Sequence, residues 1–499
     1  MKRRGSTWIR LAAALSLALA AFSAGGLSAE SALASASISS PSIAGPIPGT
    51  PYLQLGPTFD LSQVGYEQSE FFLSGTATSY LPTSPLTSDG KWSVTRNTNE
   101  PYTTRAVVYR PIDPRKFNGT VVVEWLNVSS GFDIPPEWTM MHNELVREGS
   151  VWIGVSAQRA GVQAAISNDP ARYSGVLSYP DSDSFSYDIF SQAGQAVRDA
   201  PVLLGGLRPR HVIAAGESQS AIRLVSYIDA VQPLAHVYDG FLVHSEFGTG
   251  APLSQSPESN VIPPTPTHLR DDLNAPVFLV ETETDIDRAA LLDRQPDTRR
   301  FRLWEIAGSA HFDNYGIAIG PGDTGNGQGA ALNLADMLSP VPAPNDCTLP
   351  FINAGGTHWN LNAAIYWLSK WVAAGIQPPR APLIETSTAP GVSPVGFVRD
   401  ASGNVIGGVR NPQVDSPVAA LGGVNSSAIS PPTPPSAACA LLGFTVPFSA
   451  DKLAAMYPTH GQFVRSWDRA TQNDVRAGFL LQPDAVELKA SAATVPIGK

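Results

Sequence analysis

Six dense apolar runs in the middle of this 499-residue chain constrain its fold more than any other feature. The runs cover residues 119–128, 150–158, 210–216, 238–245, 275–283 and 302–308. Because apolar residues follow one another in these runs instead of alternating with polar ones, the runs indicate strands buried on both faces. Amphipathic helical stretches, such as residues 186–199 and 220–231, lie between several of them. Strand alternating with helix predicts an α/β fold with a mostly parallel sheet covered by helices.

Other patterns flank this central region. Residues 69–80 and 103–111 alternate and are rich in Thr, Tyr and Val, which predicts antiparallel strands. Beyond residue 320 the strand pattern stops, and a strong helical pattern begins at residue 360 and ends at Gly375. We expect one elaborated domain over residues 59–499, whose C-terminal extension covers about residues 340–499.

The N-terminus has the layout of a cleaved secretory signal. Basic residues precede the apolar stretch 11–24, which is too short to span a bilayer comfortably, and small residues follow at 32–34. We predict a signal peptide over residues 1–34, a Ser/Pro/Gly-rich linker over 35–58, and a secreted or periplasmic protein. An uncleaved membrane anchor is the alternative. No later segment reads as a transmembrane helix, so none is expected after signal cleavage.

Composition excludes some classes of protein and leaves oligomeric state open. Hydrophobic residues make up 43% of the chain and charged residues 15%, which is typical of a globular protein. The net charge is −10, with no basic stripe, so a nucleic-acid partner is not expected. The glycine-rich segment 320–331 lacks the Lys of a phosphate-binding loop, and no Cys/His cluster has zinc spacing. We therefore expect neither a metal nor an organic cofactor.

The chain has only two cysteines, Cys347 and Cys439. In an oxidising compartment such a pair is a candidate disulfide, and it would tie the C-terminal region together. Two buried free thiols are the alternative. The predicted signal peptide and the even count favour the disulfide.

The segment "AAGESQSAIRL", residues 214–224, carries the candidate nucleophile, Ser218. It joins an apolar run to a helical stretch, which is the context of a G-x-S-x-G nucleophile turn. Gly216 provides the small residue on one side, whereas Ser220 stands where a second glycine is usual. A serine that merely caps the helix is the alternative reading.

A serine nucleophile needs a base that is oriented by a carboxylate, in the chain order Ser, acid, His. The acidic cluster "ETETD" ends the run 275–283, and its position after the strand favours Asp285, with Glu283 as the runner-up. His311 follows the last run in a loop of small residues, where the base belongs. His358 and His460 also follow the acid, but in helical or irregular contexts.

Two backbone N–H groups are needed to stabilise the oxyanion. One is expected from Gln219, directly after the nucleophile. The other is expected from Val128 or Ser129, in the loop at the end of the run 119–128 that also includes Asn127.

The segments "FNGTVVVEWLNVSSGFD", "GVSAQRAGV", "GESQSA", "ETETD" and "GSAHFD" together resemble a family of bacterial secreted α/β-hydrolase-domain proteins with a G-E-S-Q-S nucleophile turn. The resemblance runs from about residue 60 nearly to the end of the chain. It implies the α/β-hydrolase fold and a triad of Ser218, Asp285 or Glu283, and His311. It does not imply a particular substrate.

These features together predict a secreted serine hydrolase, most simply a carboxylic ester hydrolase that acts on an ester substrate through an acyl-enzyme. An acyltransferase with the same triad is one alternative, and a non-catalytic cell-envelope binding protein is the other. The loop 246–268 is expected to cover the site.

Overall fold

The computed structural model describes residues 38–344, 346–426 and 438–498. The predicted signal peptide, residues 1–34, lies outside these residues. From Ile38 onward the described chain forms one compact unit.

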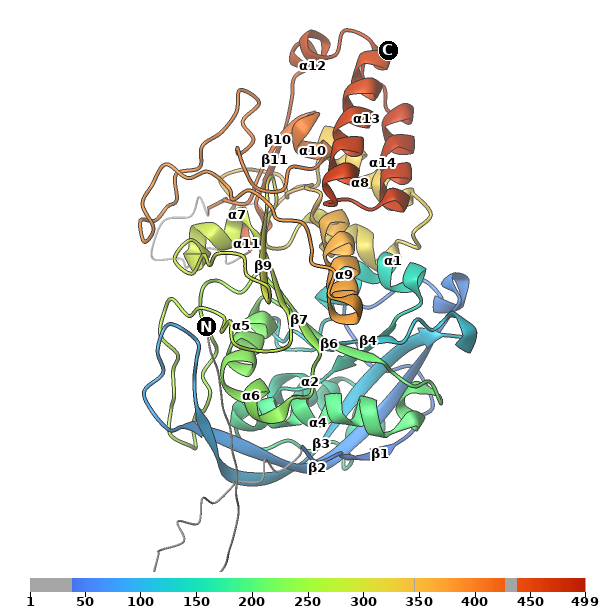
Figure 1. The fold of residues 1–499 in the computed structure, drawn as a ribbon. Helices are drawn as coiled ribbons and strands as arrows, with labels where there is room; N and C mark the ends of the chain where they lie inside the picture. The colour runs from blue at the N-terminus through green and yellow to red at the C-terminus, as the bar shows by residue number, and fades with distance from the viewer. Residues whose placement is uncertain (1–37, 345, 427–437, 499) are drawn as a thin grey trace, which may run out of the picture. The chain divides into compact units, whose positions relative to one another are not determined.

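A single large sheet organises the molecule (Figure 1). Its N-terminal strands are β1 (Ser42–Ala44), β2 (Tyr66–Pro82) and β3 (Val94–Pro111), which pair antiparallel. The strands that follow are β4 (Thr120–Trp125), β5 (Val151–Val155), β6 (His211–Glu217), β7 (Gly240–His244), β8 (Val277–Thr282) and β9 (Phe301–Ile306). The nine strands lie in the order β1-β2-β3-β5-β4-β6-β7-β8-β9. From β5 to β9 all neighbours are parallel, and these six strands coincide with the six apolar runs, which confirms the predicted α/β fold.

Helices cover both faces of the sheet because its central strands are apolar on both sides. On β4, Val122 belongs to the core under α1 (Pro136–Glu148) and α9 (Thr357–Ala374), while Val121 and Val123 belong to the opposite core. That second core packs against α4 (Ser186–Asp199), α5 (Gln219–Ser226) and α6 (Gln232–Ala235). Figure 1 shows the two helical layers on either side of the sheet. Side chains alternate along each strand, so one apolar run supplies both cores.

The connections after β5 and β8 add three short helices. These are α2 (Arg159–Asn168), α3 (Pro170–Tyr173) and α7 (Glu283–Asp285). Helix α5 continues into a π-helical segment, Tyr227–Val231, within the stretch predicted as one helix. Strand β1 lies inside the segment predicted as a linker, where it pairs with the edge of β2.

The C-terminal extension packs around a third apolar core, to which Ile286 and Leu291 after β8 and Ala307 after β9 also contribute. Helix α8 (Gln328–Leu338) precedes the extension and packs into the same core. Besides α9, the helices of the extension are α10 (Pro412–Asp415), α11 (Cys439–Leu442), α12 (Ala450–Met456), α13 (His460–Ala477) and α14 (Gln482–Thr494). The expectation that strands stop at residue 320 is wrong, because β10 (Ala419–Gly422) and β11 (Phe444–Pro447) form an antiparallel pair. Each of the two has only 4 residues, too few to produce a readable alternation.

Cys347 and Cys439 are joined in a disulfide, the pairing expected from the sequence. The bond attaches α11 to the loop after α8. Among the described residues, no helix combines the length and the apolar character that crossing a bilayer requires.

Candidate active site

Ser218 lies in a sharp turn between β6 and α5. Its backbone has φ 58° and ψ −121°, a conformation that costs a non-glycine residue on the order of 1–3 kcal/mol. Two hydrogen bonds of 2.9 Å hold the turn: the Ser218 N–H donates to the carbonyl of His244 on β7, and the Ser218 carbonyl accepts from the Ile222 N–H. Strain of this kind is stored where the surrounding structure imposes it, and here it occurs at the predicted nucleophile.

Ser220 fits the turn even though a glycine is more usual at its position. Its hydroxyl donates to the Glu217 carbonyl at 2.8 Å and accepts from the Glu217 N–H at 3.1 Å. Gly216 lies in a close contact, because a β-carbon there would be 3.1 Å from the Ser220 carbonyl group and from Cδ1 of Leu224, tighter than ordinary van der Waals contact. The hydroxyl of Ser220 therefore closes the turn, and Gly216 allows the strand and the helix to approach closely.

The structure brings Ser218, Asp285 and His311 together from three separate strand ends. Nε2 of His311 lies 2.8 Å from Oγ of Ser218, and Nδ1 lies 2.7 Å from Oδ1 of Asp285. An ionised carboxylate can only accept, so Nδ1 carries the proton and Nε2 is left to accept from the serine hydroxyl. Ser218 is 8% exposed and His311 5%, whereas Asp285 is fully buried. This is the geometry in which an imidazole takes a proton from a hydroxyl.

The carboxylate of Asp285 is held by donors on its other oxygen. Oδ2 accepts from the Thr282 N–H at 2.7 Å, from the Thr282 hydroxyl at 2.6 Å and from the Ser245 hydroxyl at 2.6 Å. Burial raises the pKa of this carboxyl, but the charge of His311 and the hydrogen bonds from His311, Ser245 and Thr282 outweigh it, so the pKa lies below its usual value. Asp285 is thus ionised and fixed in orientation.

Glu283, the runner-up for the acid, points elsewhere. Its Oε1 accepts from the Gly308 N–H at 2.7 Å, and its Oε2 accepts from the Gly423 N–H at 3.2 Å and lies 3.4 Å from Arg399. Burial raises the pKa of this carboxyl, and Arg399 only partly offsets the effect. Glu283 therefore joins the extension to the loop after β9 and makes no contact with the imidazole.

The other candidate histidines lie away from Ser218. The ring of His358 stacks on Tyr315 with centroids 3.8 Å apart, and its Nδ1 lies 2.7 Å from the Met140 carbonyl. The ring nitrogens of His460 both face backbone carbonyls of the C-terminal segment. The contacts of both histidines indicate a structural role.

The residues predicted to bind the oxyanion lie next to Ser218, and their backbone N–H groups differ in whether they already donate a hydrogen bond. The Gln219 N–H is in the first turn of α5, where no carbonyl of the helix can accept from it. The Val128 N–H points to Oε1 of Gln219 at 3.4 Å, a long and weak hydrogen bond. The Ser129 N–H donates to Oδ1 of Asn127 at 2.8 Å and is therefore engaged within its own loop. Gln219 and Val128 are the two amides that remain for a substrate oxygen.

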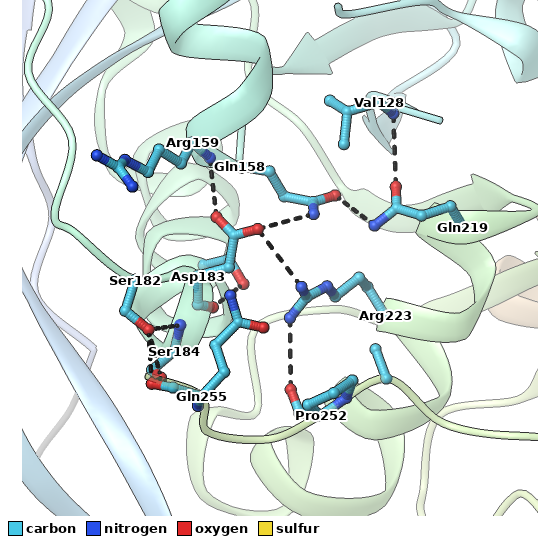
Figure 2. Close-up of polar contacts among 12 residues, drawn as sticks. Val128, Gln158, Arg159, Ser182, Asp183, Ser184, Gln219, Arg223, Pro252 and Gln255 are labelled. Carbon is cyan, nitrogen blue, oxygen red and sulfur yellow. Dashed lines mark hydrogen bonds and ion pairs between the residues drawn. The ribbon is translucent and has the colours of Figure 1, made fainter. Parts of the chain in front are cut away.

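A chain of side-chain hydrogen bonds fixes which end of the Gln219 amide faces Val128 (Figure 2). Asp183 can only accept, and its Oδ2 accepts from Nε2 of Gln158 at 3.1 Å and from Arg223 at 3.4 Å. Gln158 therefore presents Oε1 to Nε2 of Gln219 at 2.9 Å, and Gln219 presents Oε1 to Val128. The carboxylate of Asp183 thus sets the orientation of two amides, as far as residues 127–129, which form the predicted oxyanion loop.

Glu217 is the site residue that sequence reasoning missed. Its Oε1 lies 3.2 Å from Nε2 of His311, and its Oε2 accepts from Nδ2 of Asn127 at 3.0 Å. Burial, together with the carboxyls of Glu137, Asp285 and Glu124, raises the pKa of Glu217 well above its usual value. A charged residue at the end of the apolar run 210–216 is the signal that could have revealed it.

Phe247 covers the imidazole from the loop predicted to lie over the site. Its ring stacks on that of His311 with centroids 4.6 Å apart, and the Arg288 guanidinium lies 5.1 Å from the centre of the Phe247 ring. Phe247 has a φ of 67°, and Ser245 before it has 60°. Two non-glycine residues at positive φ turn the chain sharply, and this turn directs Phe247 onto His311.

In the described residues, one group of three side chains of metal-ligating types comes close together: Asp346, Cys347 and Cys439. Both sulfurs belong to the disulfide, so neither can be a thiolate ligand. This group does not form a metal site.

The parallel sheet, the strained serine at a strand–helix junction and the helices on both faces define an α/β-hydrolase fold. A sequence model of the alpha/beta hydrolase domain family matches residues 43–490, and the chain belongs to this family. No curated protein matches the chain.

The solved structures to which the chain is similar superpose on it only in part. A fungal esterase from Rhizomucor miehei is 15% identical, with 50% of this chain and 78% of that one covered at a TM-score of 0.26. An α/β serine hydrolase without a lid from Xanthomonas campestris is 10% identical, with 46% and 83% covered at 0.26. A putative acetyl xylan esterase from Bacteroides fragilis is 14% identical, with 45% and 61% covered at 0.23. These superpositions are too partial to bear on the activity of this chain.

Proposed function

We propose that this protein is a secreted serine hydrolase that cleaves carboxylic esters through an acyl-enzyme. The observation that carries the proposal is the continuous contact from Ser218 through His311 to Asp285 at a strained strand–helix turn. The predicted signal peptide and the disulfide between Cys347 and Cys439 support an oxidising compartment.

The chemistry follows from the atoms in contact. His311 Nε2 takes the proton of the Ser218 hydroxyl as Oγ bonds to the acyl carbon, and the carbonyl electron pair moves onto oxygen. The N–H groups of Gln219 and Val128 donate to this oxyanion. Asp285 stabilises the imidazolium, which then gives its proton to the leaving alcohol as the ester C–O bond breaks. Water activated by His311 releases the acid and restores Ser218.

During this cycle the hydrogen bond from the Val128 N–H to the Gln219 side chain must weaken or break, because the same N–H donates to the oxyanion. At 3.4 Å the hydrogen bond from the Val128 N–H to Oε1 is weak, so an oxyanion can compete for the same donor. A charged acceptor forms hydrogen bonds roughly twice as strong as a neutral one, which favours the oxyanion over the amide oxygen.

Labelling with a fluorophosphonate tests the proposal, because the reagent reacts only with an activated serine. We expect the wild-type protein to be labelled and to hydrolyse p-nitrophenyl acetate, and the Ser218→Ala variant to do neither. Wild-type protein that is neither labelled nor active on short esters would exclude the proposal.

Acyl transfer is the second candidate function, and the burial of the site supports it. Ser218 and His311 are only 8% and 5% exposed, and Phe247 covers the imidazole, which restricts the access of water to an acyl-enzyme. Product analysis with and without an added alcohol distinguishes the two activities: a hydrolase releases acid in both cases, whereas an acyltransferase forms a new ester.

A further inference from the structure

The imidazole of His311 has a carboxyl group at each of its two nitrogens. Asp285 lies at Nδ1, 2.7 Å away, and Glu217 lies at Nε2, 3.2 Å away. Glu217 is the last residue of β6 and is 4% exposed, so water cannot screen the contact effectively. The Nε2 atom therefore faces both the hydroxyl of Ser218 and the carboxyl of Glu217.

We propose that Glu217 is a second acidic partner of the catalytic imidazole, which stabilises the charge on His311 from the Nε2 side and positions the oxyanion loop. The inference rests on the proposed hydrolase function and concerns the same site. Glu217 exchanges no atom with the substrate. It acts on the imidazolium that exists between the two proton transfers, when Nε2 has taken the Ser218 proton and has not yet passed it to the leaving alcohol.

The same carboxyl connects the base to the oxyanion loop. Nδ2 of Asn127 donates to Oε2 of Glu217 and to its backbone carbonyl, each at 3.0 Å, while Oδ1 of Asn127 accepts from the Ser129 N–H. Asn127 immediately precedes Val128. One side chain thus sets the distance between the imidazole and the loop that supplies an oxyanion donor.

Other titratable groups surround Glu217 and favour its proton-bound form. Glu124 on β4, Glu137 on α1 and Asp285 after β8 add negative charge, and burial acts in the same direction. His244 on β7 pairs in register with Glu217, and its ring lies 3.6 Å from Glu137. Among the described residues, Asn127 Nδ2 donates to the Glu217 carboxyl, and Nε2 of His311 can donate to it only after taking a proton. Only the ionised form of Glu217 can stabilise the imidazolium, so the activity that depends on this contact is lost as the pH falls through the pKa of Glu217, which lies well above the usual value of a glutamate.

Glu217→Gln is a sharp test because the neighbours dictate how the amide must lie. Nδ2 of Asn127 can only donate, so the amide oxygen must face Asn127 and the amide N–H₂ must face Nε2 of His311. There the N–H₂ competes with the Ser218 hydroxyl for neutral Nε2 and opposes the imidazolium. The change therefore reverses the interaction while it preserves the side-chain shape.

The experiment measures kcat and KM for p-nitrophenyl acetate from pH 5 to 9, the rate of fluorophosphonate labelling and the thermal midpoint. For Glu217→Gln we expect kcat to fall roughly 10- to 100-fold with KM within about threefold. The acidic limb of the pH profile should move to lower pH, because a titrating group and its negative charge are gone. Glu217→Asp keeps the carboxylate but moves it one methylene away from His311, so its kcat should lie between those of the wild type and Glu217→Gln. This variant replaces Glu217→Gln in the experiment if the amide variant does not fold.

Two controls separate this role from a structural one. Glu281→Gln removes another buried carboxyl that does not contact His311, and its kcat should stay within about twofold of wild type. Asn127→Ala releases the oxyanion loop and leaves the carboxyl at Nε2, but it also removes a hydrogen bond that lowers the pKa of Glu217. The kcat should therefore fall while the acidic limb moves to higher pH, opposite to its movement in Glu217→Gln. The proposal is overturned if Glu217→Gln keeps the wild-type kcat and pH profile, or if its profile matches that of Asn127→Ala. An inactive wild-type protein would instead overturn the hydrolase function itself, and this inference with it.

Discussion

Oδ1 of Asp285 lies 2.7 Å from Nδ1 of His311, while Glu283, two residues earlier in the same helical turn, faces Gly308 and Gly423. The difference follows from the capping box of α7, in which Thr282 donates its N–H and hydroxyl to Asp285. We expect Asp285→Asn to lower kcat by about 10⁴-fold, since the amide would favour the wrong imidazole tautomer. Steady-state hydrolysis of p-nitrophenyl acetate by the wild type and the variant measures this loss of kcat.

Glu283→Gln is the matched control for that substitution. It should retain kcat within roughly tenfold but lower the free energy of unfolding by about 1–3 kcal/mol, because a buried acceptor of two backbone N–H groups is altered. The reverse ranking of the two variants in kcat would move the acid of the site to Glu283.

The central sheet could be predicted from the sequence because burial on both faces leaves an unmistakable apolar run. The order of Ser218, Asp285 and His311 could also be predicted, since each follows a separate run. The choice between Asp285 and Glu283 depends on the capping box of Thr282, which is a matter of side-chain direction. Position in the chain only favoured one carboxylate over the other.

Contacts between segments that are distant in the chain could not be predicted from the sequence. Glu217 meets His311 only because β6 and β9 end at the same edge of the sheet, and Phe247 reaches the same imidazole through a turn at positive φ. Periodicity carries no information about either contact. The short strands β10 and β11 could not be predicted for another reason, because each has only 4 residues, too few for an alternation to be read.

Asp183 should affect catalysis through the two amides that it orients. Asp183→Asn places an N–H₂ group among the donors Gln158, Arg159 and Arg223, so the chain that ends at Val128 loses its fixed direction (Figure 2). We expect kcat to fall roughly tenfold, less than for direct loss of an oxyanion donor. Asp181→Asn is the control, because Asp181 pairs with Arg159 but its side chain is 84% exposed. Equal kcat values for the two variants would contradict a role for the chain.

Phe247 should limit the size of the ester that reaches Ser218. Phe247→Ala removes the ring stacked on His311, so we expect kcat/KM for p-nitrophenyl octanoate to rise severalfold relative to the acetate. Ile262→Ala, in the same loop but 66% exposed, should leave this ratio unchanged. A ratio that Phe247→Ala does not alter would show that the ring does not define the entrance.

The disulfide should stabilise the protein and also support the site. Its partner Cys439 begins α11, where the Leu441 carbonyl accepts from the N–H of Phe312, next to His311, at 3.1 Å. The bond closes a separation of 92 residues, and its loss should lower the free energy of unfolding by about 4.6 kcal/mol on the chain-entropy account. Denaturant unfolding of the Cys347→Ser/Cys439→Ser variant measures this loss of free energy. We expect the rate of ester hydrolysis to be lower in the variant as well. A variant with wild-type stability would contradict this account.

Asp474 on α13 should make the protein less stable as the pH rises. Burial, together with the nearby carboxyl of Asp415, raises the pKa of Asp474 from 3.8 to about 8. Between about pH 4 and pH 8 the folded state keeps a proton that the unfolded state releases, so the free energy of unfolding falls as the pH rises through this window.

Replacing this carboxyl by an amide removes the titration and keeps the shape. Asp474→Asn should therefore raise the thermal midpoint most at pH 8 to 9 and flatten its dependence on pH, whereas the exposed Asp451→Asn on α12 should change neither. Thermal unfolding at a series of pH values from 5 to 9 measures both variants. If wild type and Asp474→Asn lost stability in parallel over this range, the carboxyl of Asp474 would be ionised in the folded protein at neutral pH, and the loss of stability would arise at other groups.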